Sequence, residues 1–303
     1  MASVTVLLTT YNSERFVREQ IDSILRQRGV ELRLVARDDG STDSTHAILD
    51  GYKERDNLSW YADGDNLGPA RSFLRMIDDA PAGSDFYALS DHDDVWLDDK
   101  LEAAVTALGA YDPAEPSLYF CQTRLVDERL QPYKKQIVIR PLLTLGEALM
   151  YLFVGGCTMV MNRPMLELVR CYRPGYLDMH DVWIYLVAHA VGAHICFDPE
   201  PHILYRQHSA NYLGQGYGWM RSLRLRFRRL VVRREHVRRN MAREALRGYS
   251  DVMPAANREL IASVADYDQS LGNQLRLLFD SRLRCASRRT YVLSKIAIIL
   301  RTL

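Results

Sequence analysis

The chain has 303 residues, of which 48% are hydrophobic and 25% are charged, and its formal net charge at pH 7 is +1. These values are those of an ordinary soluble globular protein. The longest apolar run, Ile296 to Leu300, is far shorter than the roughly 20 residues that a membrane-spanning helix needs, which excludes such a helix here.

The near-neutral net charge conceals an asymmetry along the chain. Residues 216–303 hold 19 Lys and Arg against 7 Asp and Glu, so they carry +12, and residues 1–215 hold 20 against 31 and carry −11. An acidic part followed by a basic part indicates an anionic partner for the basic part. The five cysteines are widely spaced and form no Cys-x-x-Cys pair, which predicts a reducing compartment.

Strands and helices alternate in the first part of the chain. Apolar β-prone runs predict strands at residues 4–8, 32–36, 58–62 and 86–89. Apolar side chains at helical spacing predict a helix after each of the first three strands, with Asn12 or Ser13 capping the first and Pro69 opening the third. This alternation predicts an α/β fold with a parallel sheet and right-handed crossovers.

The same patterns continue further along the chain. They predict helices at residues 98–111 and 144–152, from Pro164 and from Met179, and strands at 118–122, 154–161, 195–197 and 202–205. Gly155 and Gly156, at the start of the strand at 154–161, would permit the close approach of a ligand or of another backbone. Asp181 lies in the first turn of its helix, where a carboxylate also has the purely structural use of offsetting the helix dipole.

Polar side chains follow each of the first four predicted strands, at Thr9–Asn12, Asp38–Asp43, Asn66–Gly68 and Asp91–Asp94. In parallel sheets ligands collect at the carboxyl ends of the strands. One such cluster would be ordinary turn chemistry. Four clusters in phase are better explained by a single nucleotide-binding cleft.

The stretch Asp91–Asp94 holds three carboxylates and a histidine directly after a predicted buried strand. Carboxylates this close repel one another and lose hydration unless a cation lies among them. Oxygen ligands favour a hard cation such as Mg²⁺ or Mn²⁺. Taken alone, the stretch is equally consistent with a solvated acidic turn.

Residues 221–243 contain ten arginines, with apolar side chains recurring among them at about helical spacing. This pattern predicts a basic amphipathic helix, which would lie on an anionic membrane surface or pack on the globular part with a solvated arginine face. The apolar segment 291–301 would form a second interfacial anchor or a helix that closes the core. We expect no nucleic-acid partner, because no motif matches such a module and the first 215 residues are acidic.

In order along the chain, these motifs resemble those of the family 2 glycosyltransferases. The residues that carry the resemblance are Thr9–Asn12, Asp38–Asp43, Asn66–Gly68, Ser90–Trp96, His180–Asp181 and Arg206–His208. The resemblance implies a GT-A domain over residues 1–215, with a Rossmann-like, mostly parallel central sheet and helices on both faces, and a basic helical extension over residues 216–303. The pattern Ser-Asp-x-Asp-Asp-x-Trp with a Tyr-Arg-Gln-His ending resembles the bacterial rhamnosyltransferase branch.

The resemblance also implies residue roles. Asp181 would be the general base, and Asp91, Asp93 and His208 would bind Mg²⁺ or Mn²⁺. The nucleotide-sugar donor would be held by residues at the strand ends, namely Thr9, Tyr11, Asp38, Asp39, Asn66, Gly68, Arg71 and Asp91. The acceptor side would be formed by Gly155, Gly156, His180 and Trp183. At the position of His92 the branch most often has Gln, and at the position of His180 the superfamily more often has Glu.

The activity implied is a metal-dependent, inverting transfer of L-rhamnose from dTDP-rhamnose to a hydroxyl of a lipid-linked or growing cell-surface polysaccharide such as O-antigen. The enzyme would be peripheral at the cytoplasmic face of the cell membrane, held there by residues 216–303. Two alternatives remain open, a UDP-hexose-dependent transferase of the same family and a non-catalytic scaffold of a glycan-assembly complex. A nucleotidyltransferase would need a glycine-rich phosphate loop after the first strand, where the sequence has Thr9–Asn12.

Overall fold

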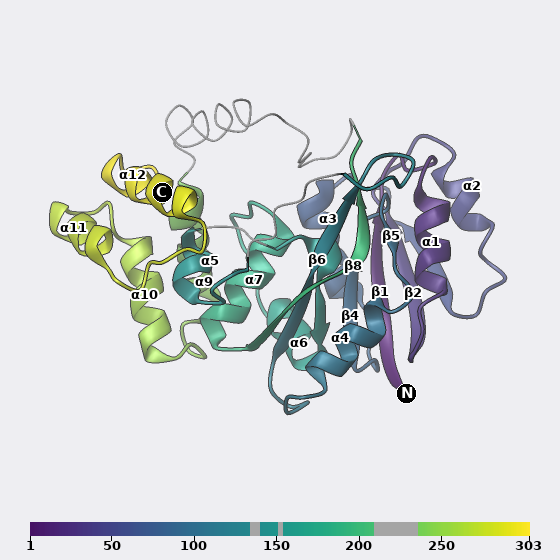
Figure 1. Ribbon diagram of the computed structural model, residues 1–303, viewed down its shortest axis with the longest axis horizontal. Helices are drawn as coiled ribbons and strands as arrows, with labels where there is room; N and C mark the ends of the chain where they lie inside the picture. Colours follow the sequence, from purple (N-terminus) through teal and green to yellow (C-terminus); the bar gives the residue numbers. More distant parts are fainter. Residues whose placement is uncertain (134–139, 151–153, 209–235) are drawn as a thin grey trace.

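The computed structural model describes residues 1–133, 140–150, 154–208 and 236–303. Within them, eight strands form one sheet in the order β3-β2-β1-β4-β7-β6-β8-β5 (Figure 1). The strands are β1 (Ala2–Thr10), β2 (Val30–Asp38), β3 (Leu58–Ala62), β4 (Phe86–Ser90), β5 (Val95–Trp96), β6 (Ser117–Val126), β7 (Val160–Asn162) and β8 (His194–Arg206). The helices are α1 (Val17–Leu25), α2 (Thr45–Asp50), α3 (Gly68–Asp79), α4 (Lys100–Leu108), α5 (Leu145–Met150), α6 (Arg163–Arg170), α7 (His180–Val191), α9 (Val237–Tyr249), α10 (Ala255–Ala265), α11 (Leu271–Phe279) and α12 (Arg288–Ile299), with a 3-10 turn η1 (Gly156–Thr158).

The predicted α/β class and mostly parallel sheet are confirmed. Strands β3, β2, β1 and β4 run parallel, as do β6 and β8, whereas β7 and β5 are antiparallel to their neighbours. Thr10 of β1 lies opposite Asp38 of β2, and Leu8 of β1 lies opposite Ser90 of β4. The carboxyl ends of these strands therefore lie together at one edge of the sheet.

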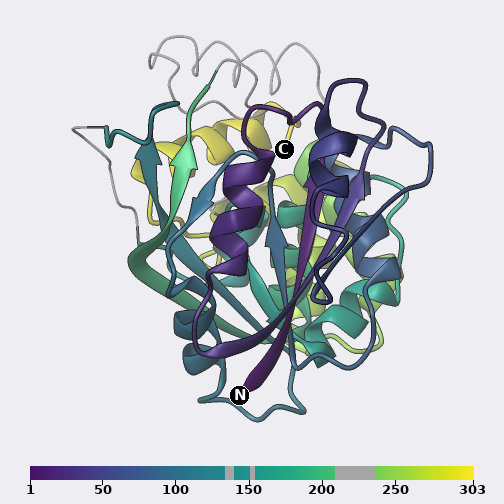
Figure 2. The same ribbon diagram turned by 90° about the vertical axis from the view of Figure 1, so that its right-hand side faces the viewer.

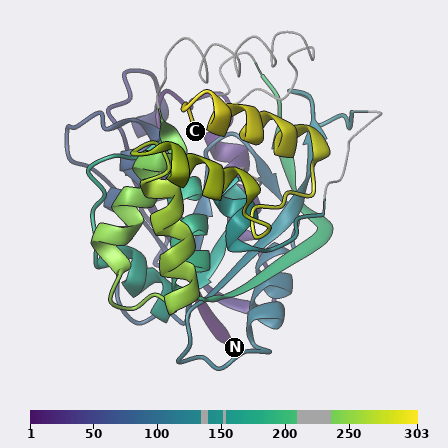
Figure 3. The same ribbon diagram turned by 90° about the vertical axis from the view of Figure 1, so that its left-hand side faces the viewer.

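Side chains alternate between the two faces of the sheet, as a pleated strand requires. On β1, Val4, Val6 and Leu8 pack with α1, α2 and α4, whereas Leu7 faces the core that α3, α6 and α7 complete. Figure 2 shows α1 in front of the sheet, on the face that Val4, Val6 and Leu8 line. Figure 3 shows α9 to α12 on the opposite side of the sheet, beyond the face that Leu7 lines. Helices thus cover both faces.

Helices α9 and α10 pack against α7 in the larger core. Met241, Tyr249 and Ile261 are fully or almost fully buried in the same cluster as Trp183. Of the predicted basic helix at 221–243, residues 221–235 lie outside the described part of the chain, and the remainder forms the start of α9. Among the described residues, no helix is both long enough and apolar enough to cross a bilayer.

The predicted cap of the first helix is wrong. Neither Asn12 nor Ser13 caps α1 with its side chain. The backbone oxygen of Ser13 accepts from the amides of Phe16 and Val17, and Asn12 Oδ1 accepts from the amide of Thr42 instead. Asn12 therefore joins the loop after β1 to the loop after β2.

The strand predicted at residues 154–161 is also wrong in its first half. The chain forms the turn η1 there, and only Val160–Asn162 pairs in the sheet. The backbone at Gly156 turns out of the strand because its amide donates to Asp181 on α7 (3.2 Å) instead of to a neighbouring strand. The two short strands predicted at 195–197 and 202–205 are one strand, β8, whose pairing with β6 shifts register at Gln122. That irregularity accommodates Pro199 and Pro201, which cannot donate to a regular ladder.

Candidate active site

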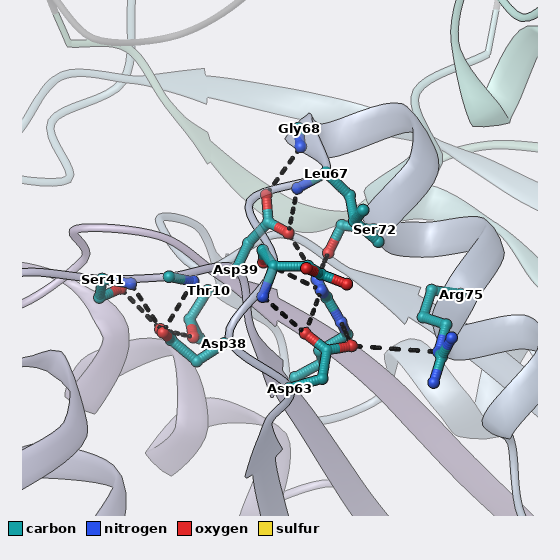
Figure 4. Close-up of polar contacts among 12 residues, drawn as sticks. Thr10, Asp38, Asp39, Ser41, Asp63, Leu67, Gly68, Ser72 and Arg75 are labelled. Carbon is teal, nitrogen blue, oxygen red and sulfur yellow. Dashed lines mark hydrogen bonds and ion pairs between the residues drawn. The ribbon is translucent and has the colours of Figure 1, made fainter.

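The first polar cluster at the sheet edge is centred on Asp38, at the end of β2. Its carboxylate accepts from Thr10 Oγ1 (2.8 Å), from Ser41 Oγ (2.6 Å) and from the amides of Gly40 (3.1 Å) and Ser41 (2.8 Å) (Figure 4). His46 Nε2 lies 2.7 Å from Oδ1. Burial alone would raise the pKa of Asp38, but these hydrogen bonds bring it below its ordinary value. A carboxylate has about four lone-pair sites, so Asp38 is saturated by the protein itself.

Asp39 connects β2 to the start of α3. Its Oδ1 accepts from the amide of Leu67 (2.9 Å) and its Oδ2 from the amide of Gly68 (2.9 Å), which satisfies amides at the helix N-terminus (Figure 4). Arg37 Nη1 donates to Oδ1 at 2.5 Å. Because a carboxylate has about four acceptor positions, these three donors leave one position of Asp39 unfilled, whereas Asp38 has none left.

Sequence reasoning did not identify Arg37 and Asp63 as parts of this cluster. The guanidinium of Arg37 is fully buried and donates to Asp39, to both oxygens of Asp63, to Ser72 and to the backbone of Asp65. Burial opposes the charge of Arg37, but the two carboxylates raise its pKa above the ordinary value. The sequence feature that could have identified Arg37 is its position between the apolar run of β2 and the aspartates Asp38 and Asp39.

Arg206, at the end of β8, holds the loop Asp91–Asp94 in place. Arg206 Nε donates to the backbone oxygen of Asp93 (2.8 Å), and its amide donates to Asp94 Oδ1 (3.1 Å). The same guanidinium reaches Glu19 on α1 and the backbone of Glu128. Arg206 thereby holds together three segments that are far apart in the sequence.

The three predicted metal ligands do not share one environment. His208 Nε2 lies 2.8 Å from Asp93 Oδ2, so the structure brings these two together. Burial alone would raise the pKa of Asp93, but the hydrogen bond with His208 and the charge of His92 bring it below its ordinary value. Burial, followed by repulsion from Asp93 and Asp181, raises the pKa of Asp91 to about 8.

A second group of possible ligands combines two carboxylates of this loop with a cysteine. Asp91, Asp94 and Cys157 each place one ligand atom within 4.8 Å of the others. Burial raises the pKa of the Cys157 thiol well above its ordinary value, and a protonated thiol is a poor ligand for a hard cation. Asp94 accepts from Arg206 through Oδ1, and burial raises its pKa well above the ordinary value. The contact with Arg206 gives Asp94 a bracing role, which leaves Asp91 and Asp93 as the candidate ligands for Mg²⁺ or Mn²⁺.

Asp181 lies in the first turn of α7, where two backbone amides hold its carboxylate. Oδ1 accepts from the amide of Val182 (2.7 Å), and Oδ2 accepts from that of Gly156 (3.2 Å). Burial raises the pKa of Asp181 to about 6, against the effect of these hydrogen bonds, and nearby Asp178 adds to the increase. A buried carboxylate with this pKa can accept a proton near neutral pH.

The other predicted acceptor-side residues differ in what they can contact. Gly155 is exposed, and His180 is buried, with its ring stacked on Phe73 at 4.0 Å. Trp183 is fully buried between Tyr172 and Tyr249, so its indole has no surface to offer an acceptor in this structure. Residues two apart on a helix point to different sides. Asp181 faces the sheet edge, so Trp183 on the same helix points away from it.

The remaining predicted donor-binding residues come from β1 and from the start of α3. Thr9 is 7% exposed and Tyr11 is 46% exposed, so of these two it is Tyr11 that can offer a ring face to a base. Asn66 and Arg71 are exposed on either side of Gly68. Gly68 has a φ of +71°, which favours glycine, and a Cβ added there would meet no atom within 4 Å.

Replacing Gly156 with Ala should damage both stability and the site. A Cβ at position 156 would overlap the His180 ring, whose Cε1 would lie only 3.1 Å away. We expect G156A to lose about 1–3 kcal/mol of unfolding free energy, as overpacked cores do. G155A is the matched control, because its Cβ would meet only Cys157 Sγ at 3.8 Å. Chemical denaturation measures both variants, and equal midpoints for the two would contradict this packing.

Comparison with solved structures identifies the fold. TarS of S. aureus, crystallised with UDP-GlcNAc, aligns with a TM-score of 0.61 at 18% identity, over 100% of this chain and 83% of that one. The mannosyltransferase PcManGT from Pyrobaculum calidifontis, in complex with GDP-Man and Mn²⁺, aligns with a TM-score of 0.56 at 20% identity, over 98% and 75%. The fold is that of the GT-A glycosyltransferases.

Sequence comparison then gives the family. Residues 5–169 match the family model described as Glycosyl transferase family 2, and the chain belongs to this family. The dTDP-rhamnosyl transferase RfbG of Shigella flexneri is 26% identical over 254 residues, which cover 78% of this chain and 83% of that protein. An uncharacterized glycosyltransferase of Rickettsia prowazekii is 27% identical over 68% of this chain, and the match spans 64% of that protein's length.

Proposed function

We propose that this glycosyltransferase moves L-rhamnose from dTDP-rhamnose, with inversion, to a hydroxyl of a lipid-linked or growing cell-surface polysaccharide. The observation that carries the proposal is the convergence of Asp91, Asp93 and Asp181 at the carboxyl-terminal edge of the sheet, where burial and then the charges of Asp93 and Asp181 raise the pKa of Asp91 to about 8. The resemblance of the motifs to the rhamnosyltransferase branch, and the similarity to RfbG, support rhamnose as the sugar.

The residues at this edge fit a divalent cation. Burial, and then repulsion from Asp93 and Asp181, raise the pKa of Asp91, and a cation beside these carboxylates would stabilise its charged form. Asp93 and His208 lie within hydrogen-bond distance of each other and would complete the ligand set for Mg²⁺ or Mn²⁺. When bound, such an ion stabilises the charge of the departing nucleoside diphosphate.

For the nucleoside, Asp39 is the better candidate of the two aspartates after β2. Asp38 has all its acceptor positions filled by the protein, whereas Asp39 retains one that could accept from a base N–H. Tyr11, exposed at the end of β1, would stack on the base. The role of Asp38 in this account is to hold the loop after β2 against Thr10.

Asp181 is the proposed general base. It would take the proton from the acceptor hydroxyl while that oxygen attacks the anomeric carbon, so inversion needs one base and no covalent intermediate. The amides of Gly156 and Val182 orient the carboxylate, and burial keeps its pKa close to working pH.

This assignment predicts the acid side of the pH–rate profile. Because burial raises the pKa of Asp181 to about 6, the base is protonated and inactive below that value. We expect the rate with saturating donor and acceptor to increase with pH and to reach half its plateau near pH 6. The D178N variant, which removes a neighbouring negative charge, should move the half-point to lower pH. A profile that is flat between pH 5 and pH 8 would contradict the assignment.

A transfer assay tests the choice of donor. Purified enzyme, Mn²⁺ and a lipid extract that contains lipid-linked glycans would be incubated in parallel with radiolabelled dTDP-rhamnose, UDP-glucose and GDP-mannose. Label that enters the lipid phase only from dTDP-rhamnose supports the proposal. Label from a UDP-hexose instead would favour the alternative of a UDP-hexose transferase, and label from none of them would favour a non-catalytic scaffold.

Such an acceptor would require the enzyme to work at a membrane surface. We propose that the protein acts as a peripheral protein at the cytoplasmic face of the cell membrane, with residues 216–303 responsible for the attachment. This segment holds 19 Lys and Arg against 7 Asp and Glu, and this positive charge supports an anionic surface as its partner.

A further inference from the structure

Helices α11 and α12 carry large apolar side chains that face away from the protein. On α11, Leu271, Leu275 and Phe279 are 64%, 45% and 78% exposed, and they are four residues apart, so they form one stripe. A second stripe runs along α12 and the residue after it, and consists of Val292, Ile296, Ile299 and Leu300, which are 45–56% exposed. We call these seven side chains the α11/α12 face.

The opposite sides of the two helices hold them to the protein. Leu277 and Ile298 are completely buried, and Gln274 Nε2 donates to the backbone oxygens of Ile298 (2.8 Å) and Ile299 (2.9 Å). Lys295 Nζ donates to the backbone oxygen of Leu278 (2.6 Å). Both helices are therefore fixed without the α11/α12 face, which the rest of the described chain leaves open.

The charges carried by residues 271–303 are almost all positive. Residues 271–303 contain seven Lys and Arg and a single carboxylate, Asp280, which pairs with Arg282 at 2.8 Å. Arg276, Arg284, Arg288, Arg289 and Arg301 are exposed. A second copy of the chain would bring like charges together, whereas an anionic bilayer offers both an apolar interior and negative headgroups.

The position of α12 suits a membrane-bound acceptor. In Figures 1, 2 and 3, which share a vertical axis, α12 lies towards the end of the molecule where the strands have their carboxyl ends, and the N-terminus lies at the other end. α12 therefore lies towards the same end of the molecule as the edge that holds Asp91 and Asp181.

We propose that the α11/α12 face docks on the surface of an anionic phospholipid bilayer. The proposal deepens the proposed function, on which its biological purpose rests, because it assigns the contact with the membrane to defined side chains. The apolar stripes enter the headgroup region, and the arginines around them bind the negative headgroups.

Flotation of the full chain with vesicles tests this proposal. The F279E/I299E variant is compared with the wild type and with V252E, a matched control that places the same charge at a 56% exposed apolar residue outside the face. Vesicles are an equimolar mixture of phosphatidylglycerol and phosphatidylcholine, or phosphatidylcholine alone. We expect the double variant to bind the anionic vesicles at least about tenfold more weakly, since two apolar groups are lost and two negative charges are added. V252E should bind like the wild type.

Several results would overturn the proposal. They are equal flotation of wild type and double variant, no flotation of the wild type on anionic vesicles, and a wild-type dimer in light scattering that the double variant abolishes without any vesicle binding. If F279E/I299E does not fold, R288Q/R289Q decides instead, because it should weaken binding to the anionic vesicles alone. Transfer of rhamnose to the lipid extract described above is measured with the same wild-type protein. Flotation without transfer would leave the docking face in place and remove the proposed function.

Discussion

Replacement of Asp181 with Asn should reduce sugar transfer by at least about 100-fold while leaving donor binding close to that of the wild type. General base catalysis typically contributes a factor of about 10²–10⁴, and the amide cannot accept the proton. The shape of the site should survive, because Asn keeps one oxygen that can accept from Val182 or Gly156. The measurement is the rate of transfer at pH 7.5, with donor affinity determined separately by calorimetry.

D178N is the control for this change. It removes a half-buried carboxylate three residues earlier that interacts with Asp181 only through its charge. We expect it to retain most of the activity at pH 7.5. If D181N transfers sugar at the wild-type rate, the base is a different group and the mechanism proposed here is incorrect.

Replacement of Arg37 with Met should cause the largest loss of stability. The guanidinium is fully buried and is the partner of both Asp39 and Asp63, so its removal leaves uncompensated carboxylates at the sheet edge. Breaking a buried ion pair in this way typically costs about 3–5 kcal/mol. Urea denaturation followed by circular dichroism should show this as a lower midpoint with a similar slope.

Arg75 provides the matched comparison. Its side chain is half exposed, pairs with Asp79 at 2.7 Å, and only approaches Asp63 at 4.0 Å (Figure 4). Solvent screens such surface pairs, so R75M should keep a midpoint close to that of the wild type. Equal losses for the two substitutions would show that the buried network does not stabilise the edge.

The predictions made from sequence succeeded where the pattern was local. The apolar runs of β1 to β4 and the helical spacing of α1, α3 and α4 were readable because each depends on residues close along the chain. The position of the polar clusters was also readable, since parallel strands end at a common edge. The metal and base candidates followed from these clusters and from the family resemblance.

The features that sequence reasoning missed depend on contacts between distant residues. Arg37 reaches Asp63 26 residues away, and Arg206 reaches Asp93 113 residues away. The turn at Gly156 exists because its amide is drawn to Asp181, 25 residues later. None of these pairings leaves a periodic pattern, so the saturation of Asp38 and the bracing of the loop at Asp91–Asp94 became visible only in the structure.

Thermal unfolding with a panel of nucleotide sugars, with and without Mn²⁺, tests the central claim most directly. Binding to the native state alone increases its stability, so a donor at about 100 times its dissociation constant should raise the midpoint by roughly 4–8 °C. We predict that dTDP-rhamnose does so only with Mn²⁺ or Mg²⁺, and that D91N and D93N abolish the increase. If no nucleotide sugar stabilises the protein in the presence of metal, or if EDTA leaves the increase unchanged, the protein is not the metal-dependent transferase proposed here.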